Sequence, residues 1–227
     1  MKAGVLTRVF RLGKAKPQGR AASHSLITLR GRGPLCDTPG MAVLPIARMG
    51  QPVLRRRAEE VADPTSSDIK TLVADMIDTM HAVNGAGLAA PQVFIPKRVV
   101  IFTVPASRST GDEHDQPQDT MAIVNPVIEP LTEDMELGWE GCLSVPGMRG
   151  VVPRFTRLRY RGITPEGEVI DRIASGWHAR VVQHEFDHLD GILYPMRMTD
   201  LGTFGFVEDL EAAARSSAEA EEIAAED

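Results

Sequence analysis

Apolar residues recur at helical spacing between Pro64 and Gly85. A period of about 3.6 residues predicts an amphipathic helix whose apolar face packs into a core. Ser66 or Ser67 is placed to cap the start of this helix, and Gly85 is placed to end it. We interpret the apolar stripe as core rather than as a cofactor site. Its members are Ile69, Leu72, Val73, Met76, Ile77, Met80 and Val83.

Further along the chain, the apolar residues form the short, partly alternating runs that predict strands. The turn Thr164–Gly167 joins two of these runs into a predicted hairpin, and a polar surface loop separates the other two. A second helix is predicted from about Gly176 to Leu189. Because strands and helices do not alternate regularly, the predicted fold class is α+β. The predicted strands are Arg98–Val104, Met121–Ile128, Arg157–Ile163 and Glu168–Ile173, and the loop is Ser107–Asp119.

Charge divides the 227 residues into three parts. Residues 1–40 carry eight Lys/Arg and one acid, and residues 208–227 carry eight acids and one base. We interpret the first part as a disordered basic extension or as codons upstream of a natural start at Met41, with an organelle transit peptide as the alternative. Residues 41–207 are the predicted folded domain, and residues 208–227 an acidic tail.

Composition excludes several classes of protein. The chain contains no run of about 18 apolar residues that would cross a bilayer. Its net charge of −6 argues against general binding of nucleic acid. The two cysteines, Cys36 in the extension and Cys142 in the body, are expected to stay unpaired, which fits a reducing compartment.

The second predicted helix contains an H-E-x-x-H pattern, His184-Glu185-Phe186-Asp187-His188. Each helical residue advances by about 100°, so His188 lies about 40° from His184 and Glu185 about 100° from it. The two imidazoles therefore project from one face, where they can bind one metal ion. Glu185 lies beside them, in a position to handle the protons of a water molecule.

A third ligand is needed, because a catalytic site takes three protein ligands and leaves one position open. A longer zinc-protease motif would place a third histidine at Tyr194, which is a poor ligand, although Gly191 matches that motif. The better candidate is Cys142, in an extended segment bounded by Gly141 and Pro146, although a lone cysteine is more often a small buried hydrophobe. The downstream acids that stay open as ligands are Asp200, Glu208 and Asp209.

Three segments of this chain together resemble the signature of the peptide deformylase family. They are Gly85–Gln92 (GAGLAAPQ), Glu140–Ser144 (EGCLS) and Gln183–Gly191 (QHEFDHLDG). Their order and separation also resemble the family's, and the resemblance covers roughly Leu44–Phe206. It implies antiparallel sheets packed around a central helix that carries the H-E-x-x-H motif.

The resemblance implies a metal-dependent hydrolase that removes the N-formyl group from new polypeptides and releases formate. Cys142, His184 and His188 would hold one divalent ion, Fe²⁺ by family habit, with Zn²⁺, Ni²⁺ or Co²⁺ as alternatives. Glu185 would take the proton of the attacking water and deliver it to the leaving amine. The Gln92 side-chain amide and the Leu143 backbone N–H would stabilise the oxyanion.

The same resemblance assigns the substrate contacts. The segment containing Gly85 and Gly87 would pair with the substrate peptide as an added strand, because glycine lets a backbone come close. Trp177 and Val181 would form a wall of the apolar pocket for the formyl-methionine side chain. Core packing is the competing interpretation for both. Two further residues, Glu140 and Arg154, are expected to pair across the site.

The partners implied are formyl-Met nascent peptides at the ribosome, with no sequence-specific nucleic acid and no membrane, and the enzyme would be a monomer or weak dimer. The expected location is the bacterial cytoplasm, or a mitochondrion or plastid if residues 1–40 are a transit peptide. Two other functions stay open. One is an H-E-x-x-H peptidase that cleaves internal peptide bonds, and the other is a metal-stabilised binding module without turnover.

Overall fold

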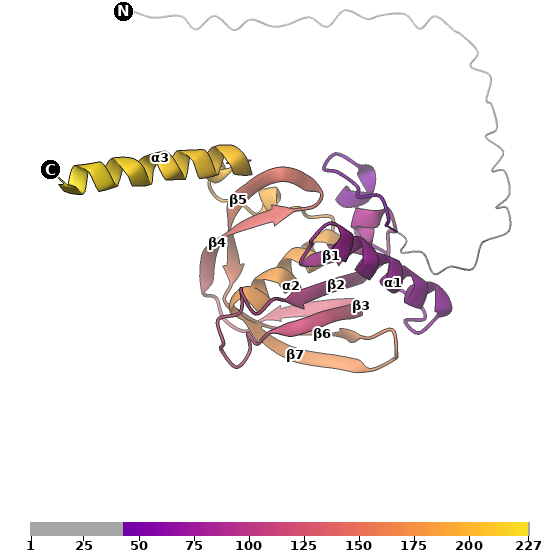
Figure 1. Cartoon of the computed structure of the whole chain (residues 1–227). Helices are drawn as coiled ribbons and strands as arrows, with labels where there is room; N and C mark the ends of the chain where they lie inside the picture. The colour runs from indigo at the N-terminus through magenta and orange to yellow at the C-terminus, as the bar shows by residue number, and fades with distance from the viewer. Residues whose placement is uncertain (1–42, 227) are drawn as a thin grey trace, which may run out of the picture. The chain divides into compact units, whose positions relative to one another are not determined.

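The computed structural model describes residues 43–226, with side chains described as far as residue 218 (Figure 1). The basic segment 1–40, the proposed start at Met41 and Cys36 lie outside the described residues. Two antiparallel sheets and a helix between them form the described body. The described residues also form four short 3-10 helices, of which the first precedes the other elements: η1 (Pro52–Arg55), η2 (Ala90–Val93), η3 (Tyr194–Met196) and η4 (Leu201–Thr203).

The larger sheet has five strands in the order β1-β2-β3-β6-β7, and every neighbouring pair is antiparallel. Within residues 43–226, β1 pairs only with β2, so it is an edge strand of the described sheet. The predicted strands and hairpin are confirmed, with ends shifted by up to three residues. The bounds are β1 (Gly87–Ala89), β2 (Val99–Val104), β3 (Gln118–Pro130), β6 (Arg157–Ile163) and β7 (Val169–Ser175).

Strand β2 shows how this sheet is covered on both faces. Successive side chains of a strand point to opposite faces. Val99 and Ile101 belong to a cluster with residues of helix α1 (Ser67–Ala82), whereas Val100 and Phe102 belong to a cluster with residues of helix α2 (Gly176–Leu189). A strand buried on both faces appears in the sequence as the continuous apolar run VVIFTV.

Helix α1 confirms the predicted apolar stripe from Ile69 to Met80, whereas Val83 lies just beyond the helix and is exposed. The structure also corrects the predicted ends. Ser66 occupies the N-cap position, but its side chain makes no capping hydrogen bond. The residue that turns the chain out of the helix is Asn84, which has a φ of 52°, rather than Gly85. Asparagine adopts this left-handed conformation at low cost, so it ends the helix one residue earlier than the glycine would.

The smaller sheet, β4 (Met135–Cys142), β5 (Val145–Phe155) and β8 (Gly205–Phe206), was not predicted as strands. In its first strand, β4, the alternating apolar side chains of Met135, Leu137 and Trp139 are exposed rather than buried. The apolar pattern of this strand therefore does not mark a buried face. Tertiary contacts therefore fix this strand rather than its own apolar pattern.

Helix α2 has the bounds that the sequence predicts, and it lies between the two sheets (Figure 1). Ten of its fourteen residues are buried, so it forms the centre of the body. The acidic segment after Glu208 forms helix α3 (Val207–Glu226). In the described part of the chain, no helix has the length and apolar character needed to cross a membrane.

The N-terminus of α2 is capped by a residue of the polar loop rather than by its own Ser175. The Asp115 side chain is fully buried and accepts hydrogen bonds from the backbone N–H groups of Trp177 and His178. It also accepts from the backbone and hydroxyl of Thr110, which closes the loop. Gly176 makes room for this contact, since a Cβ there would lie 2.5 Å from an Asp115 carboxylate oxygen.

We expect Asp115→Ala to lower the free energy of unfolding by about 1–2 kcal/mol, because the first N–H groups of α2 would lose their acceptor. Urea denaturation followed by circular dichroism measures the change. Asp119→Ala, at an exposed position of the same polar segment, is the matched control. Equal stability of the two variants would contradict this assignment.

Candidate metal centre

Cys142 is the last residue of β4, and a two-residue turn, Leu143–Ser144, leads directly into β5. The register shifts between Gly141 and Cys142, so the ladder is irregular where the cysteine projects. The Ser144 backbone N–H lies 3.4 Å from the Cys142 sulfur. The sulfur is thus held by its own hairpin.

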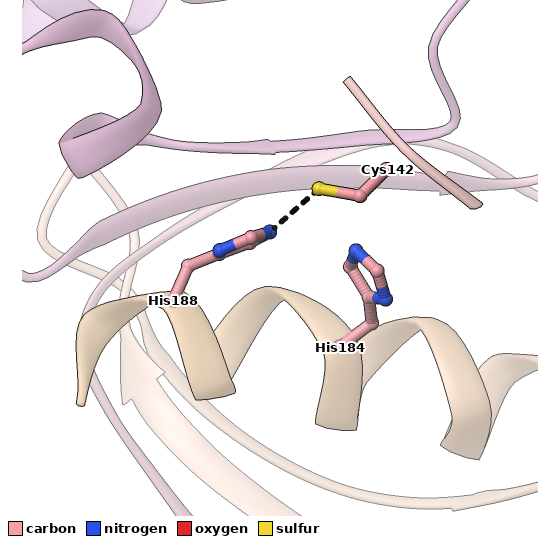
Figure 2. Close-up of side chains that lie close together, drawn as sticks. All are labelled: Cys142, His184 and His188. Atoms are coloured by element: carbon pink, nitrogen blue, oxygen red, sulfur yellow. Dashed lines mark hydrogen bonds between the residues drawn. The ribbon is translucent and has the colours of Figure 1, made fainter. Parts of the chain in front are cut away.

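His184 and His188 lie one turn apart on α2, and their ring centroids are 5.1 Å apart. Both rings face the Cys142 side chain, and Nε2 of His188 lies 3.3 Å from the sulfur (Figure 2). One donor atom from each of the three residues lies within 4.8 Å of the others. Within residues 43–226, this is the group of histidine, cysteine and acidic residues that could hold a metal ion.

The hydrogen bonds around these residues suit a metal ion. Nδ1 of His184 lies 2.8 Å from a carboxylate oxygen of Glu140, so this nitrogen donates and Nε2 is the nitrogen left to bind a metal. Nδ1 of His188 is buried without a partner in the described chain, and its Nε2 faces the sulfur. One thiolate and two imidazoles form a donor set that suits zinc, iron, cobalt or nickel.

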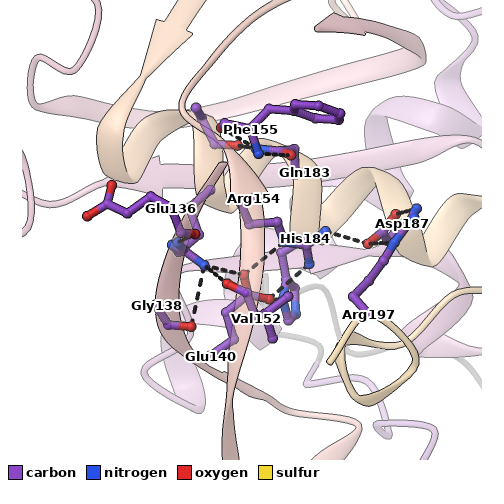
Figure 3. A network of polar contacts seen from close by, with 12 residues as sticks. Glu136, Gly138, Glu140, Val152, Arg154, Phe155, Gln183, His184, Asp187 and Arg197 are labelled. Atoms are coloured by element: carbon purple, nitrogen blue, oxygen red, sulfur yellow. Dashed lines mark hydrogen bonds and ion pairs between the residues drawn. The ribbon is translucent and has the colours of Figure 1, made fainter. Parts of the chain in front are cut away.

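Glu140 is the centre of a buried network of charges (Figure 3). Arg154 donates to both of its carboxylate oxygens at 2.9 Å, which is the pairing expected from the sequence. Arg154 also donates to Asp187 at 2.6 Å, and Asp187 accepts from Arg197. Burial alone would raise the pKa of Glu140, but Arg154 and His184 hold that pKa well below its ordinary value. The carboxylate therefore stays ionised and keeps His184 oriented.

The thiol of Cys142 is prepared for coordination in the same way. Burial would raise its pKa, but the Coulombic attraction of His188 and His184 and their hydrogen bonding hold that pKa well below its ordinary value. The thiolate is the form of cysteine that binds metals.

Glu185 lies next to the cluster and is buried. Its side chain rests on Gly87 of β1, where any Cβ would overlap the carboxylate. At Gly87, therefore, the missing side chain makes room for Glu185. Burial raises the pKa of Glu185 to about 7, and its Oε2 has no hydrogen-bond partner in the described chain. A carboxylate with such a pKa can take and return a proton near neutral pH.

Gln92 lies in η2 and is 2 % exposed. Its Oε1 accepts from the Ala89 backbone N–H at 2.8 Å, which fixes the orientation of the amide. Its Nε2 faces the cluster, 3.4 Å from the Cys142 sulfur and 3.2 Å from the Ser144 hydroxyl oxygen. Leu143 follows Cys142 in the turn, so both expected oxyanion donors lie beside the cluster.

A cavity of about 490 Å³ opens onto the cluster. The residues expected to contact substrate all line it, namely Gly85, Gly87, Trp177 and Val181. Val181 also belongs to the core, and Trp177 packs against it, so both residues have core contacts and line the cavity as well.

Several residues around the site were not assigned a role from the sequence. Arg108 lies 5.5 Å over the Trp177 ring at the cavity, and Trp139 forms part of the wall. Asp187 and Arg197 extend the charge network. The H-E-x-x-H motif assigns metal binding to its first and last positions and proton transfer to its second. The sequence gives no signal that the intervening Asp187 faces two arginines.

The alternative ligands do not join the cluster. Tyr194 is buried with its ring stacked on His184 at 6.1 Å between centroids, so it packs against a ligand candidate. Among the described residues, the acids at positions 200, 208 and 209 are not part of any group that could hold a metal.

Comparison with known proteins decides the family. The model of a family described as polypeptide deformylase matches residues 43–203. This chain belongs to the polypeptide deformylase family. Peptide deformylase 1 of Nitrosomonas europaea is 52 % identical over 168 residues, which cover 74 % of this chain and 94 % of that relative. Peptide deformylase 2 of Ralstonia nicotianae is 54 % identical over the same length and coverage.

Solved structures give the same family. A class I type b peptide deformylase from Acinetobacter baumannii with Met-Ala-Ser bound has a TM-score of 0.63 and 38 % identity, and the match covers 70 % of this chain and all of that one. The peptide deformylase of Ehrlichia chaffeensis in complex with actinonin has a TM-score of 0.66 and 34 % identity, with 72 % and 92 % covered. The predicted α+β deformylase fold is confirmed.

We expect wild-type protein purified without oxygen to carry about one divalent ion per chain, and His184→Ala or Cys142→Ala to lose most of it, because two donors bind far more weakly than three. Metal analysis by mass spectrometry measures the content. His81→Ala, on an exposed position of α1, is the matched control and should keep its metal. Full metal content in His184→Ala would contradict the assigned ligands.

Proposed function

We propose that this chain removes the formyl group from the N-terminal methionine of new polypeptides by hydrolysis at a metal ion held by Cys142, His184 and His188. Membership of the polypeptide deformylase family supports this activity. One observation carries the mechanism. The Cys142 sulfur and the imidazoles of His184 and His188 lie close together beside the buried Glu185, where a cavity opens onto them.

A bound divalent ion supplies a Lewis acid that lowers the pKa of water toward about 7 and polarises the formyl oxygen. We infer that the native ion is Fe²⁺, as the family resemblance implies, and Zn²⁺, Ni²⁺ or Co²⁺ suit the same donors.

Glu185 is the proposed general base. It takes the proton of the attacking water and then delivers it to the amine that leaves as the formyl C–N bond breaks. Its burial, its pKa of about 7 and its free carboxylate oxygen suit both halves of this transfer. Formate and a free N-terminus are the products.

The Gln92 amide and the Leu143 backbone N–H are the proposed donors to the oxyanion. The Ala89 N–H holds Gln92 in place before substrate arrives, so little reorganisation is needed during the reaction. A preorganised amide beside the cluster supports this assignment.

The substrate backbone is proposed to add to the open edge of the five-stranded sheet at β1. This mode reads main chain and tolerates many side chains, as diverse nascent chains require. Gly87 lies in β1 at this edge, Gly85 precedes the strand, and both line the cavity. The methionine side chain would lie against Trp177 and Val181.

We further infer where the enzyme works. Its substrates would be nascent peptides leaving the ribosome, where a formylated N-terminus is first exposed. The relatives reported above are bacterial proteins, which supports a bacterial cytoplasm over a mitochondrion or plastid. The proposed assembly state is a monomer or weak dimer.

Glu185→Gln should keep its metal and lose formate release by about 10²- to 10⁴-fold, because the amide cannot accept the proton of water. A coupled formate assay on formyl-Met-Ala-Ser measures the rate, and metal analysis checks the site. Glu168→Gln, in the exposed turn before β7, is the matched control. Wild-type activity in Glu185→Gln would refute the assigned base. Cleavage of unformylated peptides at internal bonds would instead favour the peptidase alternative.

Gln92→Leu should lower kcat by about 10²- to 10³-fold with a smaller change in KM, because a donor to the oxyanion acts in the transition state. Steady-state kinetics on the same peptide separate the two constants. Ser144→Ala removes a neighbouring polar partner of Gln92 and should cost far less. A loss confined to KM would show that Gln92 only binds substrate.

A further inference from the structure

The two halves of the metal cluster come from different parts of the fold. Cys142 ends a strand of the three-stranded sheet, whereas His184 and His188 belong to α2. The distance from sulfur to imidazole therefore depends on how the β4–β5 hairpin rests on the helix. Side chains make this junction (Figure 3).

Arg180 donates hydrogen bonds to four acceptors in this junction. It lies on α2 four residues before His184, so the two side chains lie on neighbouring turns of one face. Its side chain is only 14 % exposed. A guanidinium offers five N–H donors in a rigid plane, which suits several acceptors at once. The acceptors are the carbonyl oxygens of Glu136 (2.8 Å), Gly138 (3.4 Å) and Val152 (2.9 Å) and Oε1 of Glu140 (3.0 Å).

These acceptors lie on both strands of the hairpin, since Val152 belongs to β5 and the others to β4. Gly138 and Val152 are directly opposite each other in the ladder. One side chain of α2 therefore grips β4 and β5 together, a few residues before β4 reaches Cys142.

Gly138 makes this grip feasible. A Cβ at this position would lie 2.6 Å from Cζ and 2.7 Å from Nη2 of Arg180. The guanidinium thus lies where any larger residue of β4 would place its side chain. An alanine at position 138 would displace the guanidinium, which is the flexible end of its side chain, and would leave the charge of Arg180 unchanged.

Glu140 links this grip to a ligand. Its Oε1 accepts from Arg180 and Arg154, and its Oε2 accepts from Arg154 and from Nδ1 of His184. A movement of Arg180 would therefore be felt at the carboxylate that orients the His184 ring. The grip reaches the cysteine through the hairpin and the histidine through Glu140.

We propose that Arg180 is a positioning residue of the metal centre, which clamps the Cys142 hairpin onto α2 and so sets the separation of the sulfur from the two imidazoles. The proposal deepens the proposed function and rests on it for its catalytic meaning. Gln183 and Arg154 also join α2 and β5, through Phe155 and Asp187. Arg180 differs because, from α2, it donates to main-chain carbonyl oxygens of both strands as well as to the Glu140 carboxylate.

The test uses Co²⁺ as the probe on the full-length, metal-free chain. Arg180→Ala, Arg180→Lys and Gly138→Ala are each expected to weaken Co²⁺ binding by about 10- to 100-fold, the usual effect of losing a partner of a metal ligand. They should also shift the sulfur-to-cobalt absorption band, because the sulfur moves relative to the rings. Arg159→Ala, at an exposed ion pair on β6, is the matched control and should change neither quantity.

A double-mutant cycle decides whether the two residues act through one contact. Because Gly138→Ala acts by displacing Arg180, the double variant should bind Co²⁺ as Arg180→Ala does, so the two effects should not add. Additive effects would overturn the clamp. So would an unchanged affinity and spectrum in Arg180→Ala, even with a lower unfolding temperature, because that result would mean a merely structural role. If Arg180→Ala fails to fold, Arg180→Lys and Gly138→Ala give the same decision.

Failure of the proposed function would look different. Wild-type protein that binds Co²⁺ and releases no formate from formyl-Met-Ala-Ser would end the deformylase proposal. The Co²⁺ affinities and spectra of the variants would still decide the role of Arg180.

Discussion

The hydrogen bond from His184 to the buried Glu140 carboxylate is the contact on which the rest of the centre depends. A carboxylate this deeply buried is stable only with charged partners, and removing one would leave a costly unpaired charge. Arg154 and Arg180 supply those partners from β5 and α2. The need to neutralise one charge thus brings β4 and β5 of the three-stranded sheet together with the central helix at the place where the metal donors meet.

Glu185 is buried under different conditions. Glu185 is buried beside Gly87 with one oxygen unpaired in the described chain, although natural proteins normally satisfy buried polar atoms. Such an atom lowers stability and is retained where chemistry uses it. Glu140 and Glu185 are both buried carboxylates, yet their surroundings push their pKa values in opposite directions. The first is kept as a fixed charge, and the second is free to exchange a proton.

The open edge of the larger sheet and the cavity complete the arrangement. Among the described residues, β1 has no strand partner on one side, and an unpaired edge can be a liability because it invites pairing with another chain. Here that edge borders the cavity and carries Gly87 next to Glu185. A peptide that paired with β1, as proposed above, would lie beside the cluster, so this edge would serve recognition.

The sequence alone determined the elements that local hydrophobic periodicity and turn residues specify. The bounds of α2 and the hairpin of β6 and β7 follow from local spacing and turn residues, and so do the positions of His184 and His188 on one helical face. Cys142 was the better candidate for a third ligand before any family was considered, and the family signature added the role of Gln92 and the pairing of Glu140 with Arg154. Tertiary structure alone decided the hairpin of β4 and β5, whose exposed face carries Met135, Leu137 and Trp139 and so reverses the usual pattern. It also decided the capping of α2 by Asp115 and the contacts of Arg180 with the hairpin main chain, because the partners in these contacts are backbone N–H and C=O groups. Every residue but proline carries both of these groups, so no pattern of side chains reveals which of them a distant residue will find.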